Sequence, residues 1–559
     1  MSSFDFTKYR PYPQIGLKDR TWPDQVLTAA PRWCSVDLRD GNQALIEPMN
    51  VAQKLQLFQL LVKVGFKEIE IGFPAASKPD FDFVRHLIDN RMIPDDVTVQ
   101  VLTQSREELI AKSFEALAGA KRAIVHLYNS TSTTQRNDVF ELDRAGVKAI
   151  ATQGAEWVKA YAARYPATDW TFQYSPESFT GTELEYAVEV CNAVTAIWQP
   201  TPEKPCIINL PSTVEMATPN IYADQIEWMC RHIARRDAVI ISLHTHNDRG
   251  CAVAAAELAT MAGAQRVEGT LLGNGERTGN MDIVTMGMNL YTQGIDPKLD
   301  FSRMEEIIRT VKECTQLPVH PRHPWAGELV FTAFSGSHQD AIKKCLAKRP
   351  GRDAWDVAYL PVDPADLGRS YQEVIRINSQ SGKGGVAYVL EQAQGYQLPR
   401  WLQIDFSSVV QKYAEDSETE VAPEKIVELF EDHYVRNAEP YELQGYQATR
   451  DQGADRLTAT LRDGHRTVKL EGHASGVVGA FVDALERHTG KKLVLVEYNE
   501  HTLSSAGGAH AEAVAYVQLN LDGNRYCGVG RSSDIVEASL RAILGAVNQR
   551  ARLAPGVAA

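Results

Sequence analysis

The stretch AVIISLHTHNDRG, from Ala238 to Gly250, passes from a β-branched apolar run directly into two histidines. Successive side chains of a strand point to opposite faces, so His244 and His246 are expected on the same face. Two imidazoles side by side at the end of a buried strand supply half of a divalent metal site. A lone pair of this kind is more often structural than functional, so its meaning depends on the rest of the chain.

The same run belongs to a regular alternation of apolar strands and helical segments between residues 31 and 316. The expected buried strands are RWCSVDL, EIEIGF, VTVQVL, RAIVHLY, WTFQYS, PCIINL, AVIISL and RVEGTLL. Apolar residues at helical spacing mark the segments between them, such as Val51 to Val64 and Tyr222 to Ala234. Eight strand–helix units predict an α/β fold, a (β/α)8 TIM barrel. The alternative, an open doubly wound sheet, lacks the GxGxxG expected after an early strand.

Polar side chains gather where six of the eight expected strands end, the face on which a barrel builds its active site. They are Asp37 to Gln43 after the first strand, His126 in the fourth, Ser175 and Glu177 in the fifth, Ser212 and Thr213 after the sixth, the histidine pair, and Asn274, Glu276, Arg277 and Asn280 after the eighth.

Asp40 with the two histidines suits Mn²⁺, Mg²⁺, Zn²⁺ or Fe²⁺, and Asn280 is expected to complete or orient this set of ligands. Glu177 is interpreted as a base or a base's partner. His126 and Thr213 are interpreted as groups that bind a substrate carboxylate, although each alone is as readily structural.

Arg39 and Asp40 are neighbours and cannot both point inward from a regular strand. Because Gly41 follows them, we expect the chain to turn there. A permanently charged guanidinium beside a metal with open positions suits a 2-oxo acid, since Arg39 would stabilise negative charge that develops on the keto oxygen. The alternative for Arg39 is a structural salt bridge to Asp37 or Glu276.

Composition narrows the class of protein. The formal net charge of −13 and the pI near 5.6 argue against a nucleic-acid or anionic-membrane partner. Eight cysteines without CxxC spacing favour free thiols in a reducing compartment. No apolar run approaches the length of a membrane span, and the N-terminus lacks the layout of a signal peptide, so a cytoplasmic protein is expected. SGKGG at 381–385 lacks the residue order of a P-loop.

Four segments are expected along the chain: an arm at 1–30, the barrel at 31–316, helical linker subdomains at 317–430 and an α+β regulatory domain at 431–559. The last segment contains an internal repeat. RLTATLRDGHRTVKLEGHASG and a helix at 477–488 are echoed by AVAYVQLNLDGNRYCGVGRSS and a helix at 534–547. The pairs Asp463-Gly464 and Asp522-Gly523 predict hairpin turns. Each repeat would bury one sheet face, so the repeats are expected to pack together or against a partner, as a sensor or an oligomerisation module.

Three motifs, DLRDGNQ, HTHNDRG and GNGERTGN, resemble those of metal-dependent barrel enzymes that include α-isopropylmalate synthases, homocitrate and citramalate synthases and hydroxymethylglutaryl-CoA lyase. Segments outside the barrel narrow the resemblance to the long form of the α-isopropylmalate synthases, over essentially the whole chain. They are KYRPYPQIGLKDRTWP, LPVHPRHPWAGELVFTAFSGSHQDAI and YLPVDPADLGRSYQEVIRINSQSGKGGVAY.

The resemblance implies an acyltransferase that condenses acetyl-CoA with 3-methyl-2-oxobutanoate in a Claisen-type reaction. Hydrolysis of the thioester then releases 2-isopropylmalate and CoA, the first committed step of leucine biosynthesis. The implied cofactor is a divalent metal, Mg²⁺ or Mn²⁺ with Zn²⁺ as the alternative, and a monovalent cation is the implied activator. Leucine is the implied feedback effector, and the implied assembly is a domain-swapped homodimer.

Matched by motif, the resemblance assigns Asp40, His244, His246 and Asn280 to the metal, Arg39 to the keto oxygen, and His126, Ser175, Glu177 and Thr213 to the oxo-acid pocket. The residues alone give no reason to bring His338 or Tyr371 to this site. The resemblance implies that both are catalytic residues supplied by the other subunit, with His338 and Glu177 removing the methyl proton of acetyl-CoA. Tyr498 lies between the repeats, where relatives hold leucine.

Three alternatives differ in what they require. A lyase of the same group would need neither the linker nor the sensor tail. Homocitrate or citramalate synthase would differ chiefly in the pocket for the oxo-acid side chain, where one methylene changes affinity by about 1–3 kcal/mol. A non-catalytic leucine-binding regulator would be expected to have lost its metal ligands, whereas Asp40, His244 and His246 are all present.

Overall fold

The computed structural model describes residues 4–333, 335–349, 354–369, 383–417, 421–451, 453–503 and 512–553. Its contacts divide the chain into two compact units, 1–330 with 364–369, and 331–363 with 370–559. Among the described residues, none of the helices combines the length and the apolar character needed to cross a bilayer.

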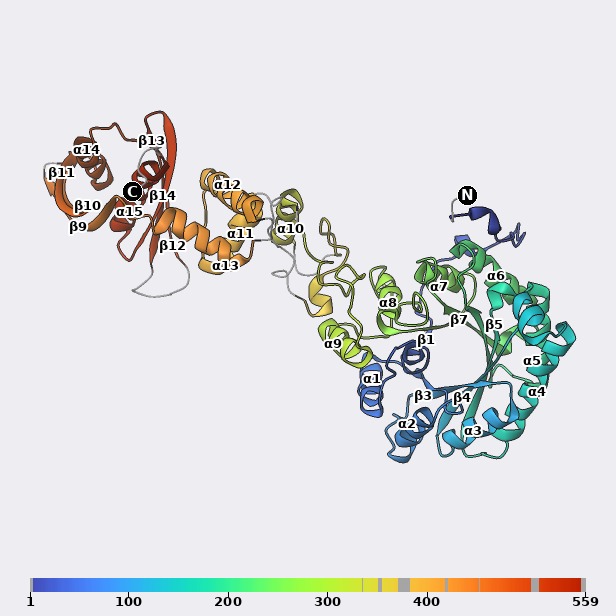
Figure 1. Cartoon of the computed structure of the whole chain (residues 1–559). Helices are drawn as coiled ribbons and strands as arrows, with labels where there is room; N and C mark the ends of the chain where they lie inside the picture. Colours follow the sequence, from blue (N-terminus) through green and yellow to red (C-terminus); the bar gives the residue numbers. More distant parts are fainter. Residues whose placement is uncertain are drawn as a thin grey trace. The chain divides into compact units, whose positions relative to one another are not determined.

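The first unit is a closed barrel of eight parallel strands, which confirms the predicted fold (Figure 1). The strands are β1 (Arg32–Ser35), β2 (Glu68–Gly72), β3 (Thr98–Gln104), β4 (Arg122–Ser130), β5 (Asp169–Glu177), β6 (Cys206–Ser212), β7 (Val239–Thr245) and β8 (Arg266–Gly269). Strand β1 pairs with both β2 and β8, with Trp33 opposite Val267, so the sheet has no free edge. All eight predicted strands are present. Strands of a parallel barrel are buried on both faces, so their sequences are largely apolar and can be recognised.

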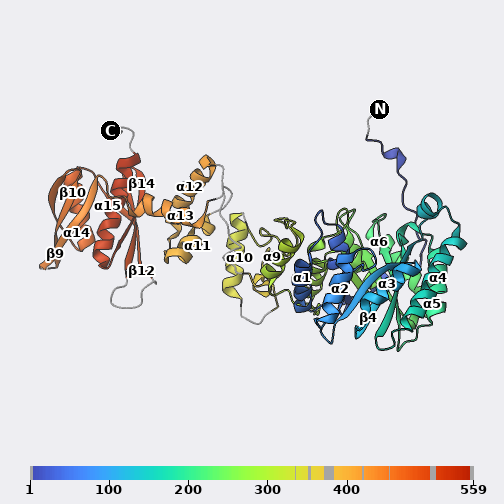
Figure 2. The same ribbon diagram turned by 60° about the horizontal axis from the view of Figure 1, so that its bottom comes forward.

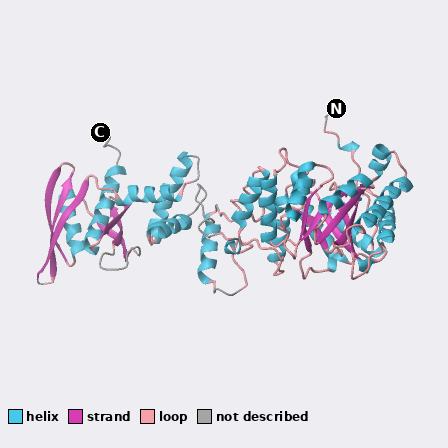
Figure 3. Cartoon of the chain, turned by 90° about the horizontal axis from the view of Figure 1, so that it is seen from below, coloured by secondary structure: helices cyan, strands magenta, loops and turns pink. Residues whose placement is uncertain are grey.

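Helices surround these strands (Figure 3). They are α1 (Val51–Val64), α2 (Lys78–Asp89), α3 (Glu107–Leu117), α4 (Arg144–Ala162), α5 (Leu184–Trp198), α6 (Pro219–His232), α7 (Ala252–Met261), α8 (Ile283–Tyr291) and α9 (Met304–Thr315). Helix α1 has the predicted bounds, because Asn50 and Gln53 form a capping box at its start and Gly65 adopts φ +114° at its end. Helix α6 begins at Pro219, earlier than the predicted Tyr222, because proline suits a first helical turn.

The first strand ends earlier than predicted, and this correction matters for the site. Strand β1 stops at Ser35, and Asp37–Gly41 form a π-helical turn in which the amides of Asp40 and Gly41 donate to the Val36 carbonyl. The Asp37 carboxylate holds this turn, because it accepts from Ser35 Oγ at 2.7 Å and from the amide of Leu271 at 3.0 Å. A helical turn can direct Arg39 and Asp40 to the same side, which removes the conflict expected for a strand.

The N-terminal residues lie on the barrel. Arg20 makes a bidentate pair with Asp224 of α6 at 2.8 Å, and the Trp22 indole donates to the same carboxylate at 2.7 Å. The amides of Thr21 and Trp22 donate to Glu227 at 3.0 Å. These bonds fix the arm to one helix of the barrel wall.

The second unit begins with helices. They are α10 (Gly336–Lys348), α11 (Lys383–Gln394), α12 (Arg400–Ser417) and α13 (Pro423–Phe430). Residues Leu390, Phe406 and Phe430 of α11–α13 form one core with Tyr516 and Val529 of the C-terminal sheet, at 494–532. The helical subdomain and that sheet therefore share buried surface.

The predicted repeat is present, but each copy has one more strand than predicted. The copies are β9 (Tyr441–Asp451), β10 (Ala454–Asp463), β11 (Arg466–Ala474) and α14 (Val477–Thr489), then β12 (Val494–Thr502), β13 (Ala513–Leu521), β14 (Asn524–Ser532) and α15 (Ile535–Leu553). The additional strands are β9 and β12, at the start of each copy. Strand β12 is an edge strand whose side chains are almost all exposed, so it lacks the apolar alternation that reveals a strand.

The two repeats pack together. Leu457 and Phe481 of the first repeat belong to the same buried core as Val517 and Ile543 of the second. Helices α14 and α15 lie against the sheets in this core (Figure 2). Both predicted hairpins exist, with two-residue loops at 464–465 and 522–523 that place Gly464, Asp522 and Gly523 at positive φ.

Candidate active site

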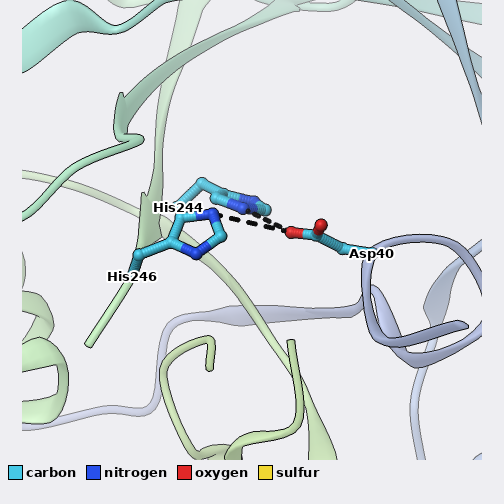
Figure 4. Close-up of side chains that lie close together, drawn as sticks. All are labelled: Asp40, His244 and His246. Carbon is cyan, nitrogen blue, oxygen red and sulfur yellow. Dashed lines mark hydrogen bonds and ion pairs between the residues drawn. The ribbon is translucent and has the colours of Figure 1, made fainter. Parts of the chain in front are cut away.

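His244 of β7 and His246, which directly follows this strand, meet Asp40 of the π-helical turn inside the barrel (Figure 4). Asp40 Oδ2 lies 3.0 Å from His244 Nε2 and 3.7 Å from His246 Nε2, and all three side chains are buried. Each offers a ligand atom within 4.8 Å of the other two. One carboxylate and two imidazoles could hold a divalent cation and would leave coordination positions for substrate and water.

His244 is oriented by a second carboxylate. Its Nδ1 lies 2.8 Å from Glu268 Oε2 of β8 and donates to this carboxylate, which turns Nε2 toward Asp40 Oδ2 at 3.0 Å. Burial disfavours an imidazolium here, but the hydrogen bonds to Asp40 and Glu268 outweigh it and raise the pKa of His244 to about 9. Burial and the nearby His244 lower the pKa of His246 to about 4. Burial opposes the charged Asp40 carboxylate, but Arg39 and His244 lower its pKa below the usual range.

Two buried polar atoms around this triad lack a hydrogen-bond partner among the described residues, His246 Nδ1 and Asn280 Oδ1. Burying an unpaired polar atom is costly unless a ligand or water satisfies it. Asn280 Nδ2 donates to Asp40 Oδ2 at 3.0 Å, and a β-bridge places Asn280 opposite His246. A divalent cation therefore fits the donor set, with Asn280 orienting the carboxylate ligand.

The loop after β8 is shaped around Asn280. A Cβ at Gly275 would lie 2.6 Å from Asn280 Oδ1 and 2.9 Å from its backbone nitrogen, and a Cβ at Gly279 would lie 2.0 Å from the carbonyl oxygen of Gly273. The GNGERTGN motif therefore needs these glycines for close packing. Arg277 of the same loop pairs with Asp248 Oδ1 at 2.6 Å.

Arg39 is held between two carboxylates. Its Nη1 lies 3.2 Å from Asp40 Oδ1, and its Nε donates to Glu70 Oε1 of β2. Glu70 Oε2 lies 2.9 Å from His126 Nδ1, and His126 Nε2 lies 2.7 Å from Ser175 Oγ. The alternative expected for Arg39 was a salt bridge to Asp37 or Glu276. The observed partners are Asp40 and Glu70 instead, because β2 neighbours the turn that carries Arg39.

A buried polar layer lies beneath these groups. Gln100 of β3 donates to Glu70, and its Oε1 accepts from Arg266 Nη2 at 2.8 Å. Arg266, fully buried, also donates from Nη1 to Glu268 Oε1 at 2.7 Å. Gln100 and Arg266 therefore connect the carboxylate that holds Arg39 with the carboxylate that holds His244.

A single cavity of about 210 Å³ opens onto this cluster. The residues predicted at strand ends that line it are Arg39, Asp40, Gln43, His126, Ser175, Glu177, Thr213, His244, His246, Glu276 and Arg277. Leu102, Tyr128 and Pro211 add apolar surface to its wall. Glu177 accepts from Ser130 Oγ, and Thr213 Oγ1 accepts from the amide of Ser178 at 2.9 Å. Residues predicted from six strand ends thus meet around one cavity.

Three predicted residues belong to the second unit. His338 lies in the first turn of α10, where its ring stacks on Tyr359. Tyr371 lies outside the described residues. Tyr498 is on β12 rather than in a loop between repeats, and its hydroxyl lies 2.8 Å from Ser539 Oγ of α15.

The carboxylates behind the site were not predicted from the sequence. Glu70 and Glu268 are fully buried in β2 and β8, where EIEIG and RVEG carry charged residues inside otherwise apolar strands. A charged residue at such a position requires a partner, so this pattern could have revealed them. Asn209 of β6 also lines the cavity and donates from Nδ2 to Ser175 Oγ at 2.9 Å. Gln100 and Asn209 give no comparable indication in the sequence, because an amide in a strand is common.

Comparisons with known proteins extend over the whole chain. Residues 30–311 match the family described as HMGL-like, 328–391 the α-isopropylmalate synthase post-catalytic domain-like family, and 420–551 the LeuA allosteric (dimerisation) domain. The chain is 58% identical over 560 residues to the 2-isopropylmalate synthase of Parafrankia sp. (strain EAN1pec), covering 99% of this chain and 98% of that one. It is 57% identical over 548 residues to the 2-isopropylmalate synthase of Rhodospirillum rubrum, covering 97% and 98%.

Proposed function

This chain belongs to the 2-isopropylmalate synthase family, and from that membership we propose how its barrel carries out the acyl transfer. The enzyme condenses acetyl-CoA with 3-methyl-2-oxobutanoate and hydrolyses the thioester, the first committed step of leucine biosynthesis. The observation that carries this assignment is the intact cavity in which Arg39 adjoins the triad of Asp40, His244 and His246.

We propose that the triad holds Mg²⁺ or Mn²⁺, with Zn²⁺ as the alternative, and that a monovalent cation activates the enzyme. A bound divalent cation supplies Lewis-acid polarisation of the keto carbonyl. Arg39 adds a fixed positive charge next to the position where the keto oxygen becomes negative. Because Glu70 and Asp40 hold the guanidinium on two sides, little reorganisation is needed as that charge develops.

The other lining groups suit the two ends of the oxo acid. His126, Ser175 and Thr213 present polar groups for its carboxylate. Leu102, Tyr128 and Pro211 give the isopropyl group an apolar wall. The 2-oxo acids used by homocitrate synthase and citramalate synthase would instead place a second carboxylate or a single methyl group against that wall.

Formation of the carbon–carbon bond requires a base for the methyl group of acetyl-CoA. We assign this role to His338 of a partner subunit, working with Glu177, and we assign Tyr371 of the same subunit as a further catalytic residue. The methyl carbon loses its proton to the imidazole and bonds to the keto carbon, and the keto oxygen takes up a proton to become the hydroxyl. Water then replaces CoA at the thioester carbonyl.

Regulation is assigned to the residues after 430. We propose that leucine binds to this duplicated domain close to Tyr498 and lowers activity, and that two chains form a domain-swapped homodimer. The match to the LeuA allosteric (dimerisation) domain supports this proposal.

We further propose that the chain is divided into an arm at 1–30, the catalytic barrel at 31–316, linker subdomains at 317–430 and the regulatory domain at 431–559. Acetyl-CoA as substrate and eight free cysteines suit a reducing cytoplasm.

The substrate assignment is tested by measuring release of the CoA thiol with acetyl-CoA and a panel of 2-oxo acids. We expect 3-methyl-2-oxobutanoate to give the highest kcat/KM. Equal thiol release with pyruvate or 2-oxoglutarate would contradict the assignment. Calorimetry with leucine tests the effector site separately, and absence of both heat and inhibition would contradict it.

A further inference from the structure

Tyr359 occupies a backbone conformation that a tyrosine rarely adopts. The amide of Leu360 donates to the Val357 carbonyl at 3.2 Å, so Tyr359 is the third residue of a β-turn, and its φ is +65°. This position in a type II turn favours glycine, because a side chain is strained there. A strained residue of this size persists only where its surroundings hold it, and such residues cluster at functional sites.

The surroundings of this turn fix it to α10. The Trp355 indole donates to the Leu360 carbonyl at 2.6 Å and closes the turn. The Arg349 guanidinium, at the end of α10, lies 4.5 Å from the centre of the Trp355 ring. The turn is therefore anchored next to the helix that carries His338.

The ring of Tyr359 stacks on the imidazole of His338. Their centroids are 3.8 Å apart and their planes differ by 22°. Tyr359 remains 60% exposed, so burial of the ring does not explain why a tyrosine stands in a position suited to glycine. The contact that the structure shows for this ring is its stack on His338.

We propose that Tyr359 is a positioning residue that holds the imidazole of His338 in one orientation by stacking on its face. This inference rests on the proposed role of His338 as the base that takes the methyl proton of acetyl-CoA. A stacked face leaves the ring edge, which carries both nitrogen atoms, for proton transfer. A displacement of the base by about 1 Å lowers the rate by up to about 100-fold. Loss of the fixed orientation should therefore be measurable as a lower kcat.

Two substitutions separate the ring from the turn. Tyr359→Gly removes the stack and relieves the strain, so the fold and its thermal midpoint should be kept or improved. Tyr359→Phe keeps the stack and removes only the hydroxyl. We expect Tyr359→Gly to lower kcat by about 10-fold or more while KM for 3-methyl-2-oxobutanoate stays within about twofold, and Tyr359→Phe to retain wild-type kcat.

A second readout does not depend on catalysis. Diethylpyrocarbonate modifies exposed imidazoles, and peptide mass spectrometry gives the rate at each histidine. The rate at His338 should rise in Tyr359→Gly and stay unchanged in Tyr359→Phe. His465, exposed in the turn between β10 and β11, serves as the internal control.

Wild-type kcat in Tyr359→Gly, together with an inactive His338→Ala, would overturn the inference and leave the role of His338 intact. Full turnover by His338→Ala would instead overturn the proposed role of His338, and this inference would fall with it for a distinguishable reason. A loss of kcat in Tyr359→Gly that Tyr359→Phe does not share, with faster modification of His338, supports it.

Discussion

His244 Nδ1 and Glu268 Oε2 lie 2.8 Å apart in the buried interior of the barrel, which directs His244 Nε2 toward Asp40. Glu268 in turn accepts from the guanidinium of Arg266, which is fully buried. The orientation of His244 therefore depends on a positive charge that has no contact with solvent. Such an outer carboxylate fixes the tautomer of a ligand and raises its basicity.

Replacing this carboxylate should weaken the metal site. Glu268→Gln removes the negative charge that His244 and Arg266 share. The amide nitrogen of the glutamine would then face a hydrogen-bond donor of one of these two residues. We expect the dissociation constant for Mn²⁺ to rise by about 10–100-fold, measured by calorimetric titration of the metal-free protein. Glu257→Gln, at a glutamate on α7 that accepts from Asn289, is the matched control. Unchanged affinity in Glu268→Gln would contradict the account.

The glycine beside Asn280 gives a second prediction. Gly275→Ala would place a Cβ 2.6 Å from Asn280 Oδ1, so the amide must leave its position against Asp40. Loss of a hydrogen bond to a charged group costs about 1.5–3 kcal/mol, so we expect metal affinity to fall by about 10-fold or more. Gly445→Ala, where a Cβ meets no heavy atom within 4 Å, should leave it unchanged. Equal behaviour of the two variants would argue against this role of Gly275.

Asp37 gives a prediction for pH. Burial raises its pKa to about 7, against opposing hydrogen bonds from Ser35 and Leu271. The unfolded chain releases this proton near pH 4, so between about pH 4 and 7 the folded protein binds a proton that the unfolded chain does not. The free energy of unfolding therefore falls as the pH rises through this range.

Asp37→Asn should remove this dependence. Between pH 5 and pH 8, the decline in the free energy of unfolding should be smaller in the variant than in wild type by about 2–3 kcal/mol. Urea titration followed by tryptophan fluorescence at the two pH values measures the difference. Asp138→Asn, at an exposed position, is the control. Parallel curves for wild type and Asp37→Asn would show that Asp37 does not titrate in this range.

The sequence predicted the barrel because its strands are buried on both faces and its helices carry caps such as Asn50 and Gly65. It misplaced the end of β1, since the π-helical turn depends on a bond from Leu271, far along the chain, to Asp37. Strand β12 was missed because most of its side chains face solvent.

Within the site, the motifs identified Arg39, Asp40 and both histidines because their chemistry is unusual at strand ends. They did not show that Glu70 and Glu268 hold Arg39 and His244. Those contacts arise only when neighbouring strands are placed in register. The resemblance to the α-isopropylmalate synthases is confirmed by relatives at 57–58% identity over almost the whole chain.

The central claim is that Asp40, His244 and His246 hold a divalent cation on which the condensation depends. The direct test is CoA thiol release from acetyl-CoA and 3-methyl-2-oxobutanoate by chelator-treated protein, before and after Mg²⁺ or Mn²⁺ is restored, in wild type and in His246→Ala. The account predicts that wild type loses activity with chelator and regains it with metal, whereas His246→Ala, although folded, stays inactive at every metal concentration. Thiol release by the chelated wild type, or by His246→Ala at the wild-type rate, would contradict it.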